Sequence, residues 1–220
     1  MFRVAFEGSD GSGKSVVCKL VCEKLRQAGV DVVLPTSDPQ RPIRSLYKHL
    51  IAQQTTFPDT NTSLFLGLAD FAYSEQLANE AEASIALFER CVYSPIADAI
   101  ALGADPEMIL PILDFFTQPD LIAYCDLSPE LSLERRRSIC TEAEAGGPFF
   151  LRPGEELQHG FLRFQSGVQM AYEMILPKSS LLVLDSRLDP DFNAQTVVDS
   201  VIGHLRGELR GSGNQGSDSW

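Results

Sequence analysis

Apolar residues gather in five short runs along the chain, and each run has the length and composition of a buried strand. The runs are RVAFE (3–7), DVVLPT (31–36), SIALFE (84–89), LIAYCD (121–126) and SLLVLD (180–185). Continuous apolar runs of this length are typical of parallel strands that are covered on both faces. The pattern therefore predicts a parallel sheet built from these five strands.

Segments with helical spacing separate the apolar runs. In the first of them an apolar stripe extends from Val17 to Leu25 and stops before Gly29, which suits a helix C-terminal cap. Further helices are predicted over 63–83, 128–137 and 155–176, and from residue 190 onward. Because strands and helices alternate throughout, we expect one doubly wound α/β domain over residues 1–206.

Two segments depart from this alternation. The stretch TEAEAGGPFFLRPG (141–154) is irregular and rich in Gly and Pro, which predicts a mobile loop. The Gly- and Ser-rich end, residues 207–220, predicts a disordered tail.

The net charge of −12 excludes binding of nucleic acid over a broad face, because such a surface repels a phosphate backbone. An anionic small molecule would then need locally concentrated Arg and Lys.

No apolar run approaches the roughly 20 residues that cross a bilayer, and MFRVAFEG lacks a signal pattern, so we expect a cytoplasmic protein with no membrane partner. Five scattered cysteines predict small core residues rather than disulfides or a zinc site.

The stretch EGSDGSGKS (7–15) follows the first strand and opens the first helix, and it matches the phosphate-binding loop pattern. Converging backbone N–H groups and the helix N-terminus favour phosphate there. Lys14 is expected to pair with the β- and γ-phosphates of ATP, and the Ser15 hydroxyl to coordinate Mg²⁺. The predicted nucleotide-binding residues are Gly8, Ser9, Asp10, Gly11, Ser12, Gly13, Lys14, Ser15 and Val16.

The loop identifies the donor but not the group that receives the phosphoryl. A switch GTPase needs an Asn-Lys-x-Asp motif after a later strand, and the stretch after the fourth strand is DLSPELS. The length of 220 residues excludes a large motor ATPase. Kinases of small molecules remain.

A set of further stretches occurs in the right order over most of residues 2–206: TSDP (36–39), FERCVYS (88–94), PDLIAYCDLSPELSLERR (119–136) and LDS (184–186). Together with the loop, this set resembles the thymidylate kinase family and, more weakly, the deoxynucleoside kinases. The resemblance implies a P-loop NTPase three-layer sandwich with strand order 2-3-1-4-5 and a mobile lid over about 137–156. It also implies ATP and Mg²⁺ as cofactors, and a homodimer, for which the apolar 63–83 helix is a candidate interface.

The resemblance also suggests residue roles. Arg90 matches an Arg that touches the acceptor phosphate and the transferring group, and Glu89 matches an acid that holds a Mg²⁺-bound water. A surface ion pair at a strand end is the alternative for these two. Asp38 matches an acid that approaches the acceptor, or is a turn residue before Pro39.

The lid is the expected second source of positive charge. Some family members carry an Arg in the phosphate loop at the place of Gly11, so this chain resembles the subtype whose lid supplies the Arg. Arg136 and Arg152 are the candidates, and a solvated helix face is the alternative for each. An Arg that enters by lid closure would exclude water from the reaction.

The acceptor side departs from the family pattern. Phe71 occupies the place of a family Arg, Gly67 that of a Phe, and Asp98-Ala99 that of a Tyr-Gln pair. Losing a cation and gaining an acid argues against tight binding of a doubly charged thymidylate, unless the alignment of the long helix is displaced by a turn. The candidate acceptor-binding residues are Asp10, Asp38, Arg44, Gly67, Phe71, Arg90, Ser94 and Asp98.

The sequence therefore predicts an ATP- and Mg²⁺-dependent kinase that acts on thymidylate or a related nucleoside monophosphate. A kinase of a deoxynucleoside or another neutral hydroxyl compound is the alternative, and an inactive nucleotide-binding module is the alternative from another class. Asp10, an acid within a phosphate loop, is expected to accept a hydrogen bond from an acceptor hydroxyl or to shape the loop.

Overall fold

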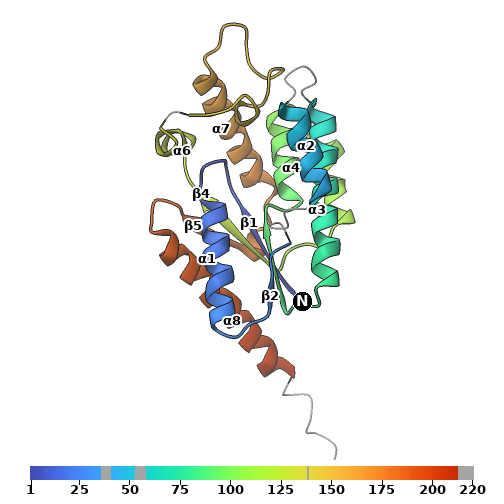
Figure 1. Ribbon diagram of the computed structural model, residues 1–220, viewed down its shortest axis with the longest axis vertical. Helices are drawn as coiled ribbons and strands as arrows, with labels where there is room; N and C mark the ends of the chain where they lie inside the picture. The colour runs from blue at the N-terminus through green and yellow to red at the C-terminus, as the bar shows by residue number, and fades with distance from the viewer. Residues whose placement is uncertain (36–40, 53–57, 138, 213–220) are drawn as a thin grey trace, which may run out of the picture.

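The computed structural model describes residues 1–35, 41–52, 58–137 and 139–212. At its centre lies a five-stranded sheet in the order β2-β3-β1-β4-β5 (Figure 1). Every neighbouring pair of strands is parallel. The strands are β1 (Phe2–Glu7), β2 (Val32–Val33), β3 (Ile85–Glu89), β4 (Leu121–Asp126) and β5 (Leu181–Asp185). The predicted P-loop NTPase fold and strand order are confirmed.

The predicted strand over 31–36 is shorter in the structure, where β2 covers only Val32–Val33. Pro35 follows closely and has no backbone N–H with which to extend the ladder. The other four strands agree with their predicted ranges to within one residue at either end, because their apolar runs are buried between two helical layers.

Helices cover both faces of the sheet (Figure 1). The α-helices are α1 (Lys14–Gln27), α2 (Pro42–Ala52), α3 (Thr60–Glu80), α4 (Tyr93–Ala101), α5 (Pro106–Ile109), α6 (Pro129–Arg135), α7 (Leu157–Ile175) and α8 (Pro190–Ser212). Short 3₁₀ helices are η2 (Leu110–Phe115), η3 (Ala143–Ala145) and η4 (Lys178–Ser180). Within the described residues, none of the helices combines the length and hydropathy needed to span a membrane.

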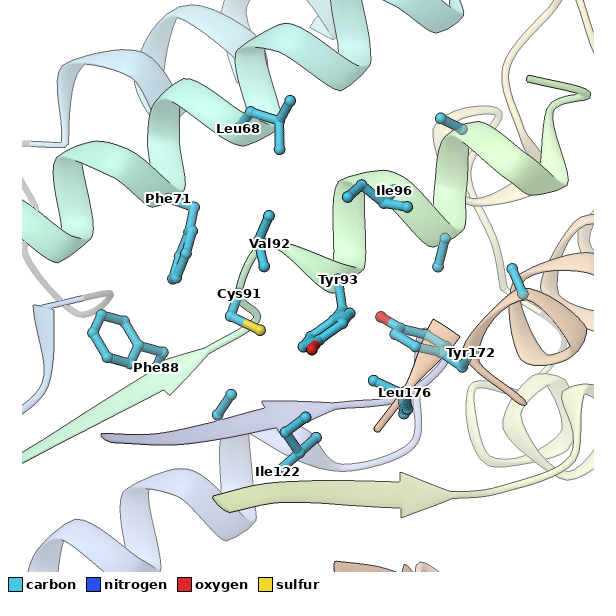
Figure 2. Close-up of a cluster of buried hydrophobic side chains, with 14 of the residues drawn as sticks. Leu68, Phe71, Phe88, Cys91, Val92, Tyr93, Ile96, Ile122, Tyr172 and Leu176 are labelled. Carbon is cyan, nitrogen blue, oxygen red and sulfur yellow. The ribbon is translucent and has the colours of Figure 1, made fainter. Parts of the chain in front are cut away.

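Each face of the sheet has its own apolar core. On one face, α1 and α8 pack against each other and bury side chains such as Val21 and Val197 over the sheet. On the other, α3, α4 and α7 cover the strands, and Figure 2 shows Leu68, Ile96 and Tyr172 of these three helices converging there. Four of the five cysteines are buried within these cores and all five are free thiols, as predicted.

Several helix boundaries differ from the predicted ones. Helix α3 begins at Thr60 rather than 63, because the Asp59 side chain accepts a hydrogen bond from the Thr62 N–H at 2.7 Å and caps the helix. Helix α8 continues through Ser212, so the predicted tail boundary at 207 lies within a helix, and residues 213–220 are outside the described ranges. Within the predicted lid, Ala145 of η3 is fully buried.

Helices α3 and α4 approach each other closely at Gly67, where an added Cβ would lie 2.7 Å from the Pro95 Cβ. We expect Gly67→Ala to destabilise the fold by about 1–3 kcal/mol, because the side chain cannot enter without displacing α4. Gly203 lies within α8 with nothing near its Cβ position, so Gly203→Ala is the matched control and should stabilise by up to about 1 kcal/mol. Urea unfolding of both variants measures the difference, and equal effects would contradict this account of the α3–α4 contact.

Candidate functional site

The loop between β1 and α1 is held in a backbone conformation that requires glycine. Gly8 and Gly11 have φ values of 139° and 81°, in the left-handed range. A Cβ on Gly8 would lie 2.5 Å from the Cys125 carbonyl oxygen, and one on Gly11 would lie 2.3 Å from the Ser132 Oγ. The loop therefore packs tightly against the end of β4 and against α6, and α1 begins directly after it at Lys14. The unpaired N–H groups of a helix N-terminus favour an anion.

Lys14 lies folded over this loop. Its side chain is buried, and its Nζ donates to the Ser9 carbonyl oxygen at 2.6 Å. Burial and, next, the charge of Arg90 lower the pKa of Lys14 to about 8. A bound anion would favour the charged form of the Lys14 side chain, so a phosphate in the loop would offset the lowering of its pKa.

Arg90 follows β3 and faces the loop. Its Nη2 forms an ion pair with Asp10, and its Nη1 donates to the Ser94 Oγ at 3.2 Å. Burial alone would raise the pKa of Asp10, but the positive charges of Arg90 and Lys14 outweigh it and lower that pKa. The acid within the loop is therefore an ionised partner of Arg90.

A buried carboxylate supports the start of α4 behind Arg90. Glu7 is fully buried, and its Oε1 accepts from the Cys91 N–H at 2.8 Å. Its Oε2 accepts from the Ser94 Oγ at 2.5 Å and from the Tyr172 hydroxyl at 2.8 Å. Figure 2 shows the Tyr172 hydroxyl pointing toward the start of α4. Sequence reasoning missed Glu7, although an acid that ends an apolar strand was a visible signal.

The two candidate metal ligands lie side by side. The Ser15 Oγ donates to Glu89 Oε1 at the junction of the loop, α1 and β3. A hydroxyl beside one carboxylate fits Mg²⁺, which in nucleotide sites keeps several waters and takes further oxygens from the phosphates. In the ranges that the structure describes, no group of three His, Cys, Asp or Glu side chains forms a metal site.

A cavity of about 660 Å³ opens beside the loop. Its walls come from α2, α3, α4 and the predicted lid. The structure brings together in this cavity Asp10, Arg44, Gly67, Phe71, Arg90, Ser94 and Asp98. These are all the candidate acceptor residues except Asp38, which lies outside the described ranges.

Phe71 belongs mainly to the core rather than to the cavity. Its ring is 5% exposed and packs edge-on against Phe88, with ring centroids 5.5 Å apart. Figure 2 shows the ring turned from α3 toward β3. The lid contributes the rings of Phe149 and Phe150 to the cavity wall, which sequence reasoning did not single out.

A buried ion pair in the cavity wall was also missed. Arg41, just before α2, pairs through its Nη2 with Asp70 of α3, and both residues are buried. Asp70 directly precedes Phe71, the place of the lost family Arg. A cation therefore still reaches this wall, but it comes from the residue before α2 and not from α3.

The two candidate lid arginines lie in different surroundings. Arg136 donates from Nη2 to Glu144 Oε1 at 2.5 Å, and its Cδ would lie 3.2 Å from a Cβ on Gly11, so it lies against the phosphate loop. Arg152 is exposed, and its backbone N–H donates to Glu155 Oε2 at 2.9 Å. It is not among the residues that line the cavity.

Gln165 of α7 connects the phosphate loop to the predicted lid. Its side chain is only 2% exposed. The Oε1 atom accepts from the Asp10 N–H at 3.0 Å, and the Nε2 atom donates to the Glu144 carbonyl oxygen at 3.0 Å. The Gln165 amide therefore forms one hydrogen bond with the phosphate loop and one with the predicted lid.

A family model described as "Thymidylate kinase" matches residues 6–145, more than half of the chain and including the loop and most of the cavity. The chain belongs to the thymidylate kinase family. The resemblance found in the sequence is therefore confirmed, and the chain is a phosphotransferase of the nucleotide kinase type.

Individual members of the thymidylate kinase family agree with this. A protein named "Probable thymidylate kinase" from Sulfolobus acidocaldarius is 32% identical over 137 residues, covering 61% of this chain and 69% of the relative. A protein named "Thymidylate kinase" from Leptospira interrogans is 29% identical over 204 residues, covering 90% of this chain and 91% of the relative. A thymidylate kinase from Ligilactobacillus salivarius is 31% identical over 143 residues, covering 60% and 68%.

Proposed function

We propose that this protein transfers the γ-phosphoryl of ATP to a nucleoside monophosphate, thymidylate or a related one. The observation that carries the proposal is the ion pair between Arg90 and Asp10, which lies where the phosphate loop meets the cavity. A donor phosphate in the loop and an acceptor in the cavity would both face Arg90. Because enzymatic phosphoryl transfer depends on positioning and on neutralising oxygen charge, this junction suits the reaction.

The residues have distinct parts in this proposal. The backbone of residues 8–16 and Lys14 hold the donor phosphates, and Arg90 neutralises the oxygens of the group in transit. An acceptor phosphate oxygen bonds to the γ-phosphorus while the bond between that phosphorus and the β–γ bridging oxygen breaks, and ADP leaves with the bond electrons. Arg136 is the lid cation placed to assist, whereas Arg152 and Asp38 stay predictions.

Ser15 and Glu89 would hold Mg²⁺, whose charge offsets that of the phosphate oxygens when it is bound. The proposal also includes a homodimer in which two copies of the chain pair through α3, where Phe65 is 63% exposed.

A neutral hydroxyl acceptor is a second candidate, favoured by the acid Asp98 in the cavity wall. An inactive nucleotide-binding module is a third, but the buried Lys14 and the Arg90 junction speak for catalysis.

Mass spectrometry of reactions with ATP, Mg²⁺ and a panel of nucleoside monophosphates and nucleosides tests the proposal. We expect a nucleoside diphosphate from at least one monophosphate. Product from nucleosides alone would favour the neutral acceptor instead. ATP binding without product from any acceptor would contradict the proposal and favour the inactive module.

A further inference from the structure

Asp98 lies on the cavity side of α4. Residues that line the cavity recur at Ser94 and Asp98 of this helix and at Leu102, which directly follows it, each four positions after the last and therefore on one face. The series begins at Arg90, which precedes the helix. Asp98 is thus the acid that α4 presents to the cavity, next along the helix from the Arg90–Ser94 contact.

The Asp98 carboxylate has no hydrogen-bond donor among the residues that the structure describes, and its residue is partly buried in the cavity wall. The guanidinium of Arg90 acts on its charge from nearby, yet the hydrogen bonds of that guanidinium go to Asp10 and Ser94. A carboxylate that is partly withdrawn from water loses part of its hydration and is stabilised by each hydrogen bond that it accepts. The missing donor therefore has to come from water or from a ligand in the cavity.

The charges around Asp98 leave it ionised at neutral pH. Burial raises its pKa to about 6, Arg90 and Lys14 oppose the rise, and Asp10 and Glu7 add to it. Tyr47 of α2, whose own pKa is raised by burial, also faces this charge. Above about pH 6 the group is an acceptor of hydrogen bonds and repels anions.

We propose that Asp98 determines acceptor specificity by accepting a hydrogen bond from an O–H or N–H group on the neutral part of the acceptor. This inference rests on the proposed kinase function and names the substrate class more narrowly. The donor has two chemical sources, a second sugar hydroxyl, as in a ribonucleotide, or an exocyclic amine on the base. In either case the preferred acceptor carries a donor group at this place, and an acceptor without it is the poorer substrate.

Three acceptors separate the two sources. Deoxycytidylate has an exocyclic amine and an unprotonated ring nitrogen where deoxyuridylate has a carbonyl oxygen and a ring N–H, and cytidylate adds a 2′-hydroxyl to deoxycytidylate. We expect kcat/KM of the wild type to rise by about tenfold or more either from deoxyuridylate to deoxycytidylate or from deoxycytidylate to cytidylate. A hydrogen bond to a charged group implies a rise of this size. The step at which it rises identifies the source.

Asp98→Asn and Asp98→Ala should reduce that rise to about threefold or less. Asp114→Asn removes an exposed acid outside the cavity and is the matched control, with the full rise retained. Thermal unfolding of each variant shows whether it is folded. In the wild type the rise should also shrink as pH falls through about 6, and this dependence should be absent in Asp98→Asn.

The inference would be overturned by a wild type with no rise at either step, by a rise that survives in both Asp98 variants, or by an equal loss on all three acceptors. The last result would mean that Asp98 only stabilises the fold or holds Arg90 in position. Absence of transfer to every acceptor in the wider panel would instead contradict the kinase function itself, so the two failures are distinguishable.

Discussion

Lys14→Ala is expected to lower kcat for phosphoryl transfer by about 10³-fold. The Lys14 ammonium is buried over the loop and donates to the Ser9 carbonyl, so its positive charge is concentrated where the donor phosphates would lie. No other side chain on α1 can replace it, because the helix begins at this residue and the next lysine, Lys19, is exposed. Steady-state kinetics with the best acceptor from the panel would measure the loss.

Lys19→Ala is the matched control for this variant. It removes one lysine charge from the same helix at an exposed position and should leave kcat within about twofold of the wild type, as a solvated surface charge contributes little. Equal kcat values for the two variants would mean that the loop lysine takes no part in transfer.

Arg90→Ala is expected to have the second large effect, a loss of about 10³-fold in kcat/KM, because the cation at the junction of loop and cavity disappears. It also leaves Asp10 without the charge that contributes most to holding its pKa down, so an acid faces the phosphates unneutralised. The loss therefore has two parts, a missing positive charge and an uncompensated negative one.

A double variant separates these parts. Asp10→Asn combined with Arg90→Ala removes the uncompensated acid, so it should unfold at a higher temperature than Arg90→Ala alone but recover only part of kcat/KM. Arg187→Ala removes an arginine whose side chain is 71% exposed and serves as the control. Full recovery of kcat/KM in the double variant would contradict a direct part for Arg90.

The sheet and the phosphate loop could be predicted from the sequence because their causes are local. The apolar runs mark buried strands, and the spacing of Gly8, Gly13, Lys14 and Ser15 matches one backbone conformation at the start of one helix. The role expected for Arg90 came from the resemblance of FERCVYS to the thymidylate kinase family, and its place after a predicted strand agrees with that role. These predictions need no knowledge of which distant residues touch.

The residues that were missed depend on contacts between segments far apart in the chain. Glu7 meets Ser94 and Tyr172, which are 87 and 165 positions away, and no local pattern marks them as partners. Arg41 reaches Asp70 across 29 positions. The packing of the Phe71 ring against Phe88 could not be predicted for the same reason, since only the fold shows that the two rings lie side by side.

Gln165 has a consequence for how the loop and the predicted lid respond to each other. Because its one amide holds both the Asp10 N–H and the Glu144 carbonyl, separating the two segments would leave a buried polar group unpaired, at a cost of about 1–3 kcal/mol. An anion that settles in the loop and thereby holds Asp10 in place also favours the present position of η3. By thermodynamic reciprocity, whatever retains η3 there strengthens the binding of that anion by the same factor.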